Sequence, residues 1–214
     1  ATAVVLYKAA GDSLSAHSLN LVKNIIGVCL LIPAAFFVHG MAFPQLTGLE
    51  WATLIASGYL GIAIADTWYL QALRYLGAGR TAIIASLYSP FVVTLSILFL
   101  AESLEPWQWL GFVMVITGII IVVYQRRYSH VEGSFLLKGL MLAAASVFLT
   151  AAGVVAMKPL LGNEGFFWMV ALRLLAGTVG MVILLAVMRK LGHFVTEVRT
   201  GDHRWAVIAP APAI

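Results

Sequence analysis

Length, composition and charge exclude an ordinary soluble domain. The chain has 214 residues, of which 62% are hydrophobic and 10% are charged, whereas a typical soluble domain has about 25% charged residues. The formal net charge of +4 does not indicate a nucleic-acid partner, because the basic residues stand near the ends of hydrophobic segments, where membrane topology places them. A single cysteine, Cys29, excludes a disulfide framework and a multi-cysteine metal site.

In chain order, six hydrophobic segments are long enough to cross a bilayer, which takes about 20 apolar residues in a helix. They cover residues 18–38, 51–73, 81–101, 107–124, 135–157 and 166–188. Their apolar residues run continuously, whereas those of a strand in a membrane barrel alternate with polar ones. The sequence therefore predicts an all-α membrane protein, a polytopic helical bundle surrounded by the lipid bilayer.

Shorter hydrophobic stretches precede and follow these six segments. The residues before Lys8 and the stretch 205–214 are each too short to span a bilayer. We interpret them as parts of two further helices, so that the bundle is truncated at both ends. The alternative is that they are complete re-entrant or interfacial segments.

Two parts of the chain share one pattern of residues. AVVLYK at 3–8 resembles GVVAMK at 153–158, and three identical or similar residues recur at an offset of 150. The matched pairs are Lys8 with Lys158, Lys23 with Arg173, and Gly27 with Gly177. We therefore expect a duplicated five-helix repeat, with a first copy at 1–128 and a second copy at 133–214 that is truncated after its second helix. Because five is an odd number, the two copies would be inverted in the membrane, as in many secondary transporters.

The basic residues predict the orientation of the spans. Eleven lysines and arginines fall on one side of the six segments, and only Lys158 and Arg173 fall on the other. The positive-inside rule makes the first side cytoplasmic.

The most specific motifs lie within residues 72–124. ALRY (72–75), a loop with Arg80, SLYSPF (86–91) and LFLAESLEPWQWLG (98–111) follow one another. This run resembles the EamA family of the drug/metabolite transporter superfamily. The resemblance implies a ten-helix carrier, built as five plus five helices, that moves a small metabolite or drug-like solute. It also implies a cytoplasmic N-terminus, whereas the charge count predicts the reverse, and we follow the charge count.

We therefore expect a secondary transporter of a bacterial or archaeal inner membrane that works by alternating access. The alternative is a non-transporting helical scaffold or a channel-like protein. An enzyme is not expected, because Asp66 is the only acidic residue inside a span and all five histidines lie in or beside loops. No cofactor or metal ion is expected, and the candidate partners are the unknown solute and a coupling proton.

Asp66 is the sharpest candidate for the transport site. A charged residue at the centre of a membrane helix costs about 2.5–3.5 kcal/mol on insertion scales, so it should face the bundle interior or water. Tyr59, Ile62 and Tyr69 stand at spacings that place them on the same helical face as Asp66. This face would hold a proton or a cationic group of the solute. The alternative is that Asp66 is a packing anchor.

A second polar face, near one end of the segment 18–38, contains Asn20, Lys23 and Asn24, and Arg173 has a similar place in the segment 166–188. The two cations would bind an anionic group of the solute at the mouths of a cavity. The interpretation that we favour is that both extend their charged ends to the membrane interface. Asn24 is expected to face the interior, because an amide seeks a partner within a helical bundle.

Polar and small residues also follow one face of the segment 81–101. Ser86 and Ser89 lie on this face, and Pro90 should bend the helix because it removes one backbone hydrogen bond. Such a break at mid-membrane is a common place for solute contacts, although serine faces and proline bends also serve ordinary helix packing. We expect Ser86 and Ser89, with Tyr69, to contribute polar contacts in a central cavity.

Overall fold

The computed structural model describes residues 15–40, 43–125, 133–161 and 165–200. In these ranges the regular structure is helical and no strand occurs, which confirms the all-α fold. The elements in chain order are α2 (Ala16–His39), α3 (Gly48–Gly58), η1 (Tyr59–Ala65), α4 (Asp66–Leu76), α5 (Ala78–Ala85), α6 (Tyr88–Leu100), α7 (Pro106–Gln125), α8 (Gly133–Leu161), α9 (Phe166–Val187) and α10 (Leu191–Thr200).

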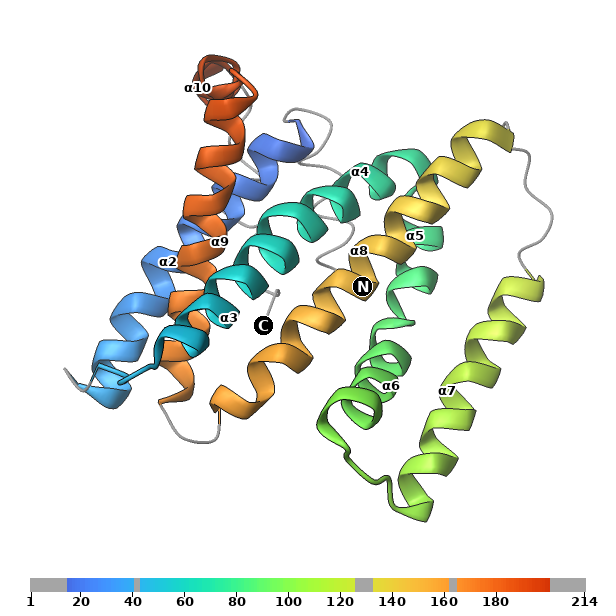
Figure 1. Ribbon diagram of the computed structural model, residues 1–214. Coiled ribbons are helices and arrows are strands. Elements are labelled where there is room, and N and C mark those ends of the chain that lie inside the picture. The colour runs from blue at the N-terminus through green and yellow to red at the C-terminus, as the bar shows by residue number, and fades with distance from the viewer. Residues whose placement is uncertain (1–14, 41–42, 126–132, 162–164, 201–214) are drawn as a thin grey trace.

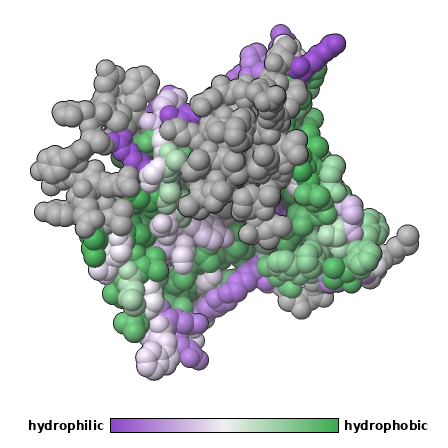
Figure 2. Space-filling view, turned by 180° about the vertical axis from the view of Figure 1, so that it is seen from behind, coloured by the Kyte–Doolittle hydropathy of each residue, from purple (hydrophilic) through white to green (hydrophobic). Residues whose placement is uncertain are grey.

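The described helices have the length and composition of membrane spans. Five stretches are long and apolar enough to cross a bilayer, and the apolar part of α7 adds a shorter one. The five are Ala16–His39, Gly48–Leu76, Ala78–Leu100, Leu137–Leu161 and Phe166–Val187. In the space-filling view from behind, hydrophobic residues cover the flanks and hydrophilic residues gather towards the upper and lower ends (Figure 2). The protein is therefore a polytopic helical membrane protein, and the six predicted spans each correspond to a helix or a run of helices.

The helices are arranged around a central pair (Figure 1). The continuous run α3–η1–α4 and helix α8 cross the middle, α2, α9 and α10 lie on one side, and α5, α6 and α7 lie on the other. Helices α2 and α9 are antiparallel, because Leu21 shares a buried cluster with Leu185 and Ala35 shares another with Trp168. This arrangement brings α2, η1 and α9 together in the interior.

The second described span changes its helical form halfway. Between Tyr59 and Ala65 it is a π-helix, with α-helix on both sides. A π-helix has i→i+5 hydrogen bonds and turns less per residue than an α-helix, and such segments are frequent at functional sites. The spacing rule that placed Tyr59 and Asp66 on one face assumes an α-helix, so it does not hold across this segment.

The third described span bends where it was predicted to bend. Helix α5 ends at Ala85 and α6 begins at Tyr88, so the break lies just before Pro90. Proline has no N–H to donate to the carbonyl group four residues earlier, which is that of Ser86. This confirms the predicted effect of Pro90 on the helix.

Candidate solute and coupling site

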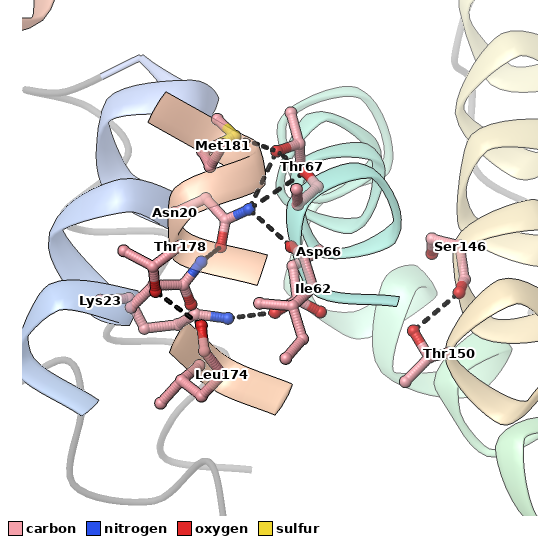
Figure 3. A network of polar contacts seen from close by, with 12 residues as sticks. Asn20, Lys23, Ile62, Asp66, Thr67, Ser146, Thr150, Leu174, Thr178 and Met181 are labelled. Carbon is pink, nitrogen blue, oxygen red and sulfur yellow. Dashed lines mark hydrogen bonds and ion pairs between the residues drawn. The ribbon is translucent and has the colours of Figure 1, made fainter. Parts of the chain in front are cut away.

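An ion pair inside the bundle is the centre of the candidate site. The ammonium group of Lys23 on α2 binds the carboxylate of Asp66 at the start of α4 (Figure 3). Their side chains are 15% and 27% exposed, so both charges are mostly withdrawn from solvent. The interpretation that Lys23 extends its charge to the membrane interface is therefore wrong. Lys23 turns inwards because Asp66, forty-three positions later in the chain, offers an opposite charge in the interior.

Two buried amides join α2 to the π-helix beside this ion pair (Figure 3). The amide nitrogen of Asn20 donates to the carbonyl oxygen of Ile62 at 2.9 Å, to that of Ala63 at 3.4 Å and to the hydroxyl of Thr67 at 3.0 Å. Asn24 donates in turn to the side-chain oxygen of Asn20 at 3.1 Å. Both asparagines are fully buried, which confirms the predicted interior position of Asn24. The network holds α2 against η1 in a defined register.

Arg173 on α9 reaches into the same region from the other side. A Cβ atom added to Gly61 of η1 or to Gly153 of α8 would lie 2.9 Å from a terminal guanidinium nitrogen, so the group passes closely between these two helices. Asp66 and Tyr88 are near enough to interact with its charge. The buried Nε atom of Arg173 has no hydrogen-bond partner among the described residues. Arg173 thus points into the bundle, and the expectation that it extends to the interface is wrong.

The structure separates several residues that the sequence placed together. Tyr69 stays near Asp66. Tyr59 instead packs against Gly180 of α9, where a Cβ atom would lie 2.5 Å from its ring, and it lines an apolar groove between α3 and α9. This is a correction to the predicted shared face, and the intervening π-helix is its physical reason.

Ser86 and Ser89 do not lie beside the ion pair. Ser86 donates its hydroxyl hydrogen to the carbonyl oxygen of Ala82 at 3.2 Å and lines a groove towards α7, and Ser89 lines a second groove with Gln108 of α7. The residue of this span that approaches Arg173 is Tyr88, which sequence reasoning passed over. Its one available signal was a phenol inside the apolar motif 86–91.

A short amphipathic helix, α10, closes one end of the α2–α9 pair and was not predicted. Glu197 accepts hydrogen bonds from the backbone N–H of Ser15 at 3.2 Å, from its hydroxyl at 2.8 Å, and from the hydroxyl of Ser18. Burial alone would raise the pKa of Glu197, but the hydrogen bonds from Ser18 and Ser15 outweigh it, and the pKa lies below its usual value. These bonds fasten α10 to the first turn of α2.

At the opposite end of the bundle, the carboxylate of Glu102 lies 2.6 Å from the ammonium group of Lys158. This contact ties the loop after α6 to the end of α8. Pro106 is the first residue of α7, as expected for proline at a helix start. The side chains of Glu102 and Lys158 are both substantially exposed, so their ion pair contributes little to stability, about 0–1 kcal/mol.

These features define a class of protein. A helical bundle in the membrane, with an ion pair in its interior and a π-helix beside it, has the architecture of a membrane transport protein. The chain belongs to the EamA-like transporter family, whose model matches residues 1–124.

Two relatives from Bacillus subtilis (strain 168) are similar to this chain. The uncharacterized transporter YxxF is 26% identical over 115 residues, which cover 54% of this chain and 36% of the relative. The uncharacterized transporter YvbV is 26% identical over 163 residues, which cover 76% of this chain and 51% of the relative. The chain thus matches between about a third and half of the length of these relatives.

Proposed function

We propose that the protein is a secondary transporter that moves a small metabolite or drug-like solute across a bacterial inner membrane by alternating access. The observation that carries this proposal is the ion pair between Lys23 and Asp66, because intramembrane charges are costly and are typical of solute and proton pathways. Membership in a family of transporters and the similarity to two proteins named as transporters support it.

The packing of α2 against α9 supports an inverted duplication, with copies at 1–128 and 133–214. These helices carry the matched pairs Lys23 with Arg173 and Gly27 with Gly177. Both glycines lie at close helix contacts, since a Cβ atom on Gly27 would be 2.8 Å from Leu174 and one on Gly177 would be 2.6 Å from Ile62. Antiparallel packing of two equivalent helices is what an inverted duplication predicts.

Asp66 is the coupling residue in this mechanism. When it is ionised, it attracts Lys23 and holds α2 against α4; two unit charges about 4 Å apart attract by ~4 kcal/mol at an effective dielectric constant of about 20. A proton on Asp66 removes this attraction and leaves Lys23 without its counter-charge. Protonation thus favours a different arrangement of the two helices, which couples a proton gradient to the movement of the cavity.

The end of the bundle with α10 faces the cytoplasm in this proposal. In Figure 1 this end holds α10, the end of α9, the end of α4 and the beginnings of α5 and α8, and the end of α8 lies at the opposite end. Of the described basic residues outside the interior site, six belong to the first group of segments and Lys158 belongs to the end of α8. The six are Arg74, Arg80, Lys138, Arg189, Lys190 and Arg199. The positive-inside rule gives this orientation.

The test is the water accessibility of position 66 in the full-length protein. The variant carries Cys29→Ser and Asp66→Cys and is treated with a membrane-impermeant maleimide from each side of the membrane, and Cys29→Ser alone is the control. We expect labelling from at least one side, because a carrier needs a water-filled cavity at its site. A second control carries Cys29→Ser and Glu102→Cys, which places the cysteine in the loop after α6. If this loop cysteine reacts and the cysteine of Asp66→Cys does not react from either side, Asp66 is a packing residue and a non-transporting scaffold is favoured.

A further inference from the structure

We propose that Arg173, framed by Gly61 and Gly153 and faced by Tyr88, is the binding site for a carboxylate group, and that the transported solute is therefore a small monocarboxylate. This inference rests on the transport function proposed above and names the chemical class of the solute. Lys23 and Asp66 hold and couple the helices in that function, whereas Arg173 binds the solute.

The first argument is the balance of charge in the bundle interior. Two cations, Lys23 and Arg173, and one anion, Asp66, lie inside the bundle among the described residues of the spans. Lys23 and Asp66 neutralise each other through their direct contact. Arg173 interacts with Asp66 only at longer range, so one positive charge is left over. An arginine without a counter-charge inside a membrane bundle is costly, and a single negative charge on a solute offsets that cost.

The second argument is the hydrogen-bonding capacity of Arg173. Its Nε atom is buried and has no partner among the described residues. A buried donor without an acceptor destabilises the structure, and an acceptor group on a ligand removes that cost. The planar guanidinium group presents paired N–H donors that match the two oxygens of a carboxylate. A lysine at this position would offer a point charge without that match.

The third argument is the shape of the surrounding helices. Gly61 and Gly153 come from different helices, η1 and α8, and each leaves open the space into which the guanidinium group extends. A side chain at either position would meet the guanidinium nitrogen at 2.9 Å. Tyr88 on α6 is partly exposed and close enough to Arg173 to interact with its charge, and we expect its hydroxyl to donate to the same ligand. Residues of η1, α8 and α6 thus lie near the end of the Arg173 side chain.

A monocarboxylate fits this balance better than a doubly charged phosphate. One surplus positive charge is cancelled by one negative charge, whereas a phosphate dianion would leave a net negative charge in the interior. The same counting disfavours a purely cationic solute, since Asp66 already has Lys23 as its partner. The ligand class therefore follows from Arg173, the interior cation that has no ion-pair partner among the described residues.

The experiment measures ligand-dependent thermal unfolding of the purified full-length protein in lipid nanodiscs. The probes are acetate, butyrate and benzoate, each compared with its uncharged amide. We expect at least one carboxylate to raise the Tm in a saturable manner and its amide to leave the Tm unchanged. Arg173→Gln should weaken this binding at least tenfold. Arg173→Lys should weaken it less, because lysine keeps the positive charge but lacks the paired N–H donors of the guanidinium group. Arg199→Gln, on the exposed surface of α10, is the matched control and should bind as the wild type does.

A second pair of variants guards against misfolding of the arginine substitutions. Gly61→Ala places a methyl group against the guanidinium nitrogen and should weaken binding, whereas Gly111→Ala, with nothing within 4 Å, should not. The proposal is overturned if none of the carboxylates stabilises the wild type, or if Arg173→Gln binds as tightly as the wild type. If the maleimide labels position 66 but no carboxylate binds, the carboxylate site is rejected and the transport proposal stands. If position 66 is not labelled, neither the transport proposal nor the carboxylate site has a basis.

Discussion

Replacing Asn20 by leucine should destabilise the bundle far more than the same change at Asn24, although the two amides are neighbours and equally buried. The reason is their different hydrogen bonding. Asn20 donates to the carbonyl oxygen of Ile62 and to the hydroxyl of Thr67, and it accepts from Asn24. Among the described residues the Asn24 side chain makes that one hydrogen bond, and its own oxygen is buried without a partner.

The magnitudes follow from these contacts. An interhelical hydrogen bond in a membrane protein contributes about 0.6 kcal/mol on average, so the loss of the bonds to Ile62 and Thr67 costs about 1.2 kcal/mol. Asn20→Leu also leaves the Asn24 amide without its acceptor, which adds about 1–3 kcal/mol. We expect a loss of about 2–4 kcal/mol in the free energy of unfolding for Asn20→Leu and about 0.5 kcal/mol or less for Asn24→Leu.

The assay is reversible unfolding of the full-length protein in mixed micelles, with the two single variants and the double variant. The double variant should lose less free energy of unfolding than the sum of the losses of the two single variants. The reason is that Asn24→Leu removes the amide that Asn20→Leu leaves unpaired. Equal losses for the two single variants, or strict additivity in the double variant, would show that the network does not hold α2 against η1 in the way that the distances indicate.

Two further predictions concern α10 and the close helix contacts. The pKa of Glu197 is lowered in the folded protein. Its hydrogen bonds therefore stabilise the docked α10 fully at any pH above the ordinary glutamate pKa, and this stabilisation is lost as the pH falls through the lowered pKa. Spin-label distances between α10 and the start of α2 should therefore increase in acid, and Glu197→Gln should increase them at neutral pH, whereas the remote change Glu105→Gln should not. Gly58→Ala should lower the Tm, because its Cβ atom would lie 2.5 Å from the backbone oxygen of Arg173. Gly111→Ala should leave the Tm unchanged or raise it, because its site is open and alanine favours a helix by up to about 1 kcal/mol; the opposite order of the two Tm values would contradict the packing of α3 on α9.

Several features of this fold could be predicted from local sequence, because a helix in lipid must satisfy its own backbone hydrogen bonds. Continuous apolar runs of sufficient length are enough to locate the spans. The bend before Pro90 and the start of α7 at Pro106 follow from the missing N–H and fixed φ of proline. The interior position of Asn24 follows from the cost of an unpaired amide in lipid.

The amphipathic helix α10 shows where local reasoning stops. Its ten residues are too few and too polar to read as a span, and they form a helix that docks through Glu197 onto Ser15 and Ser18, almost 180 positions earlier. A local pattern does not name a partner at that distance. The groove positions of Ser86 and Ser89 have the same cause, because the rotation of α5 and α6 about their axes is set by the helices that pack against them.

The sequence by itself determined that the protein is a helical membrane bundle and that Asp66 lies in its interior, because burial in lipid and the cost of an intramembrane charge depend on composition along one segment. Only the tertiary structure decided which cation pairs with that acid, which tyrosines lie near it, and where Arg173 points. The physical reason is that these contacts join different helices across a π-helix, whose altered turn per residue carries Tyr59 away from Asp66. Contact between helices depends on their relative rotation and depth, which packing sets and spacing along one chain does not.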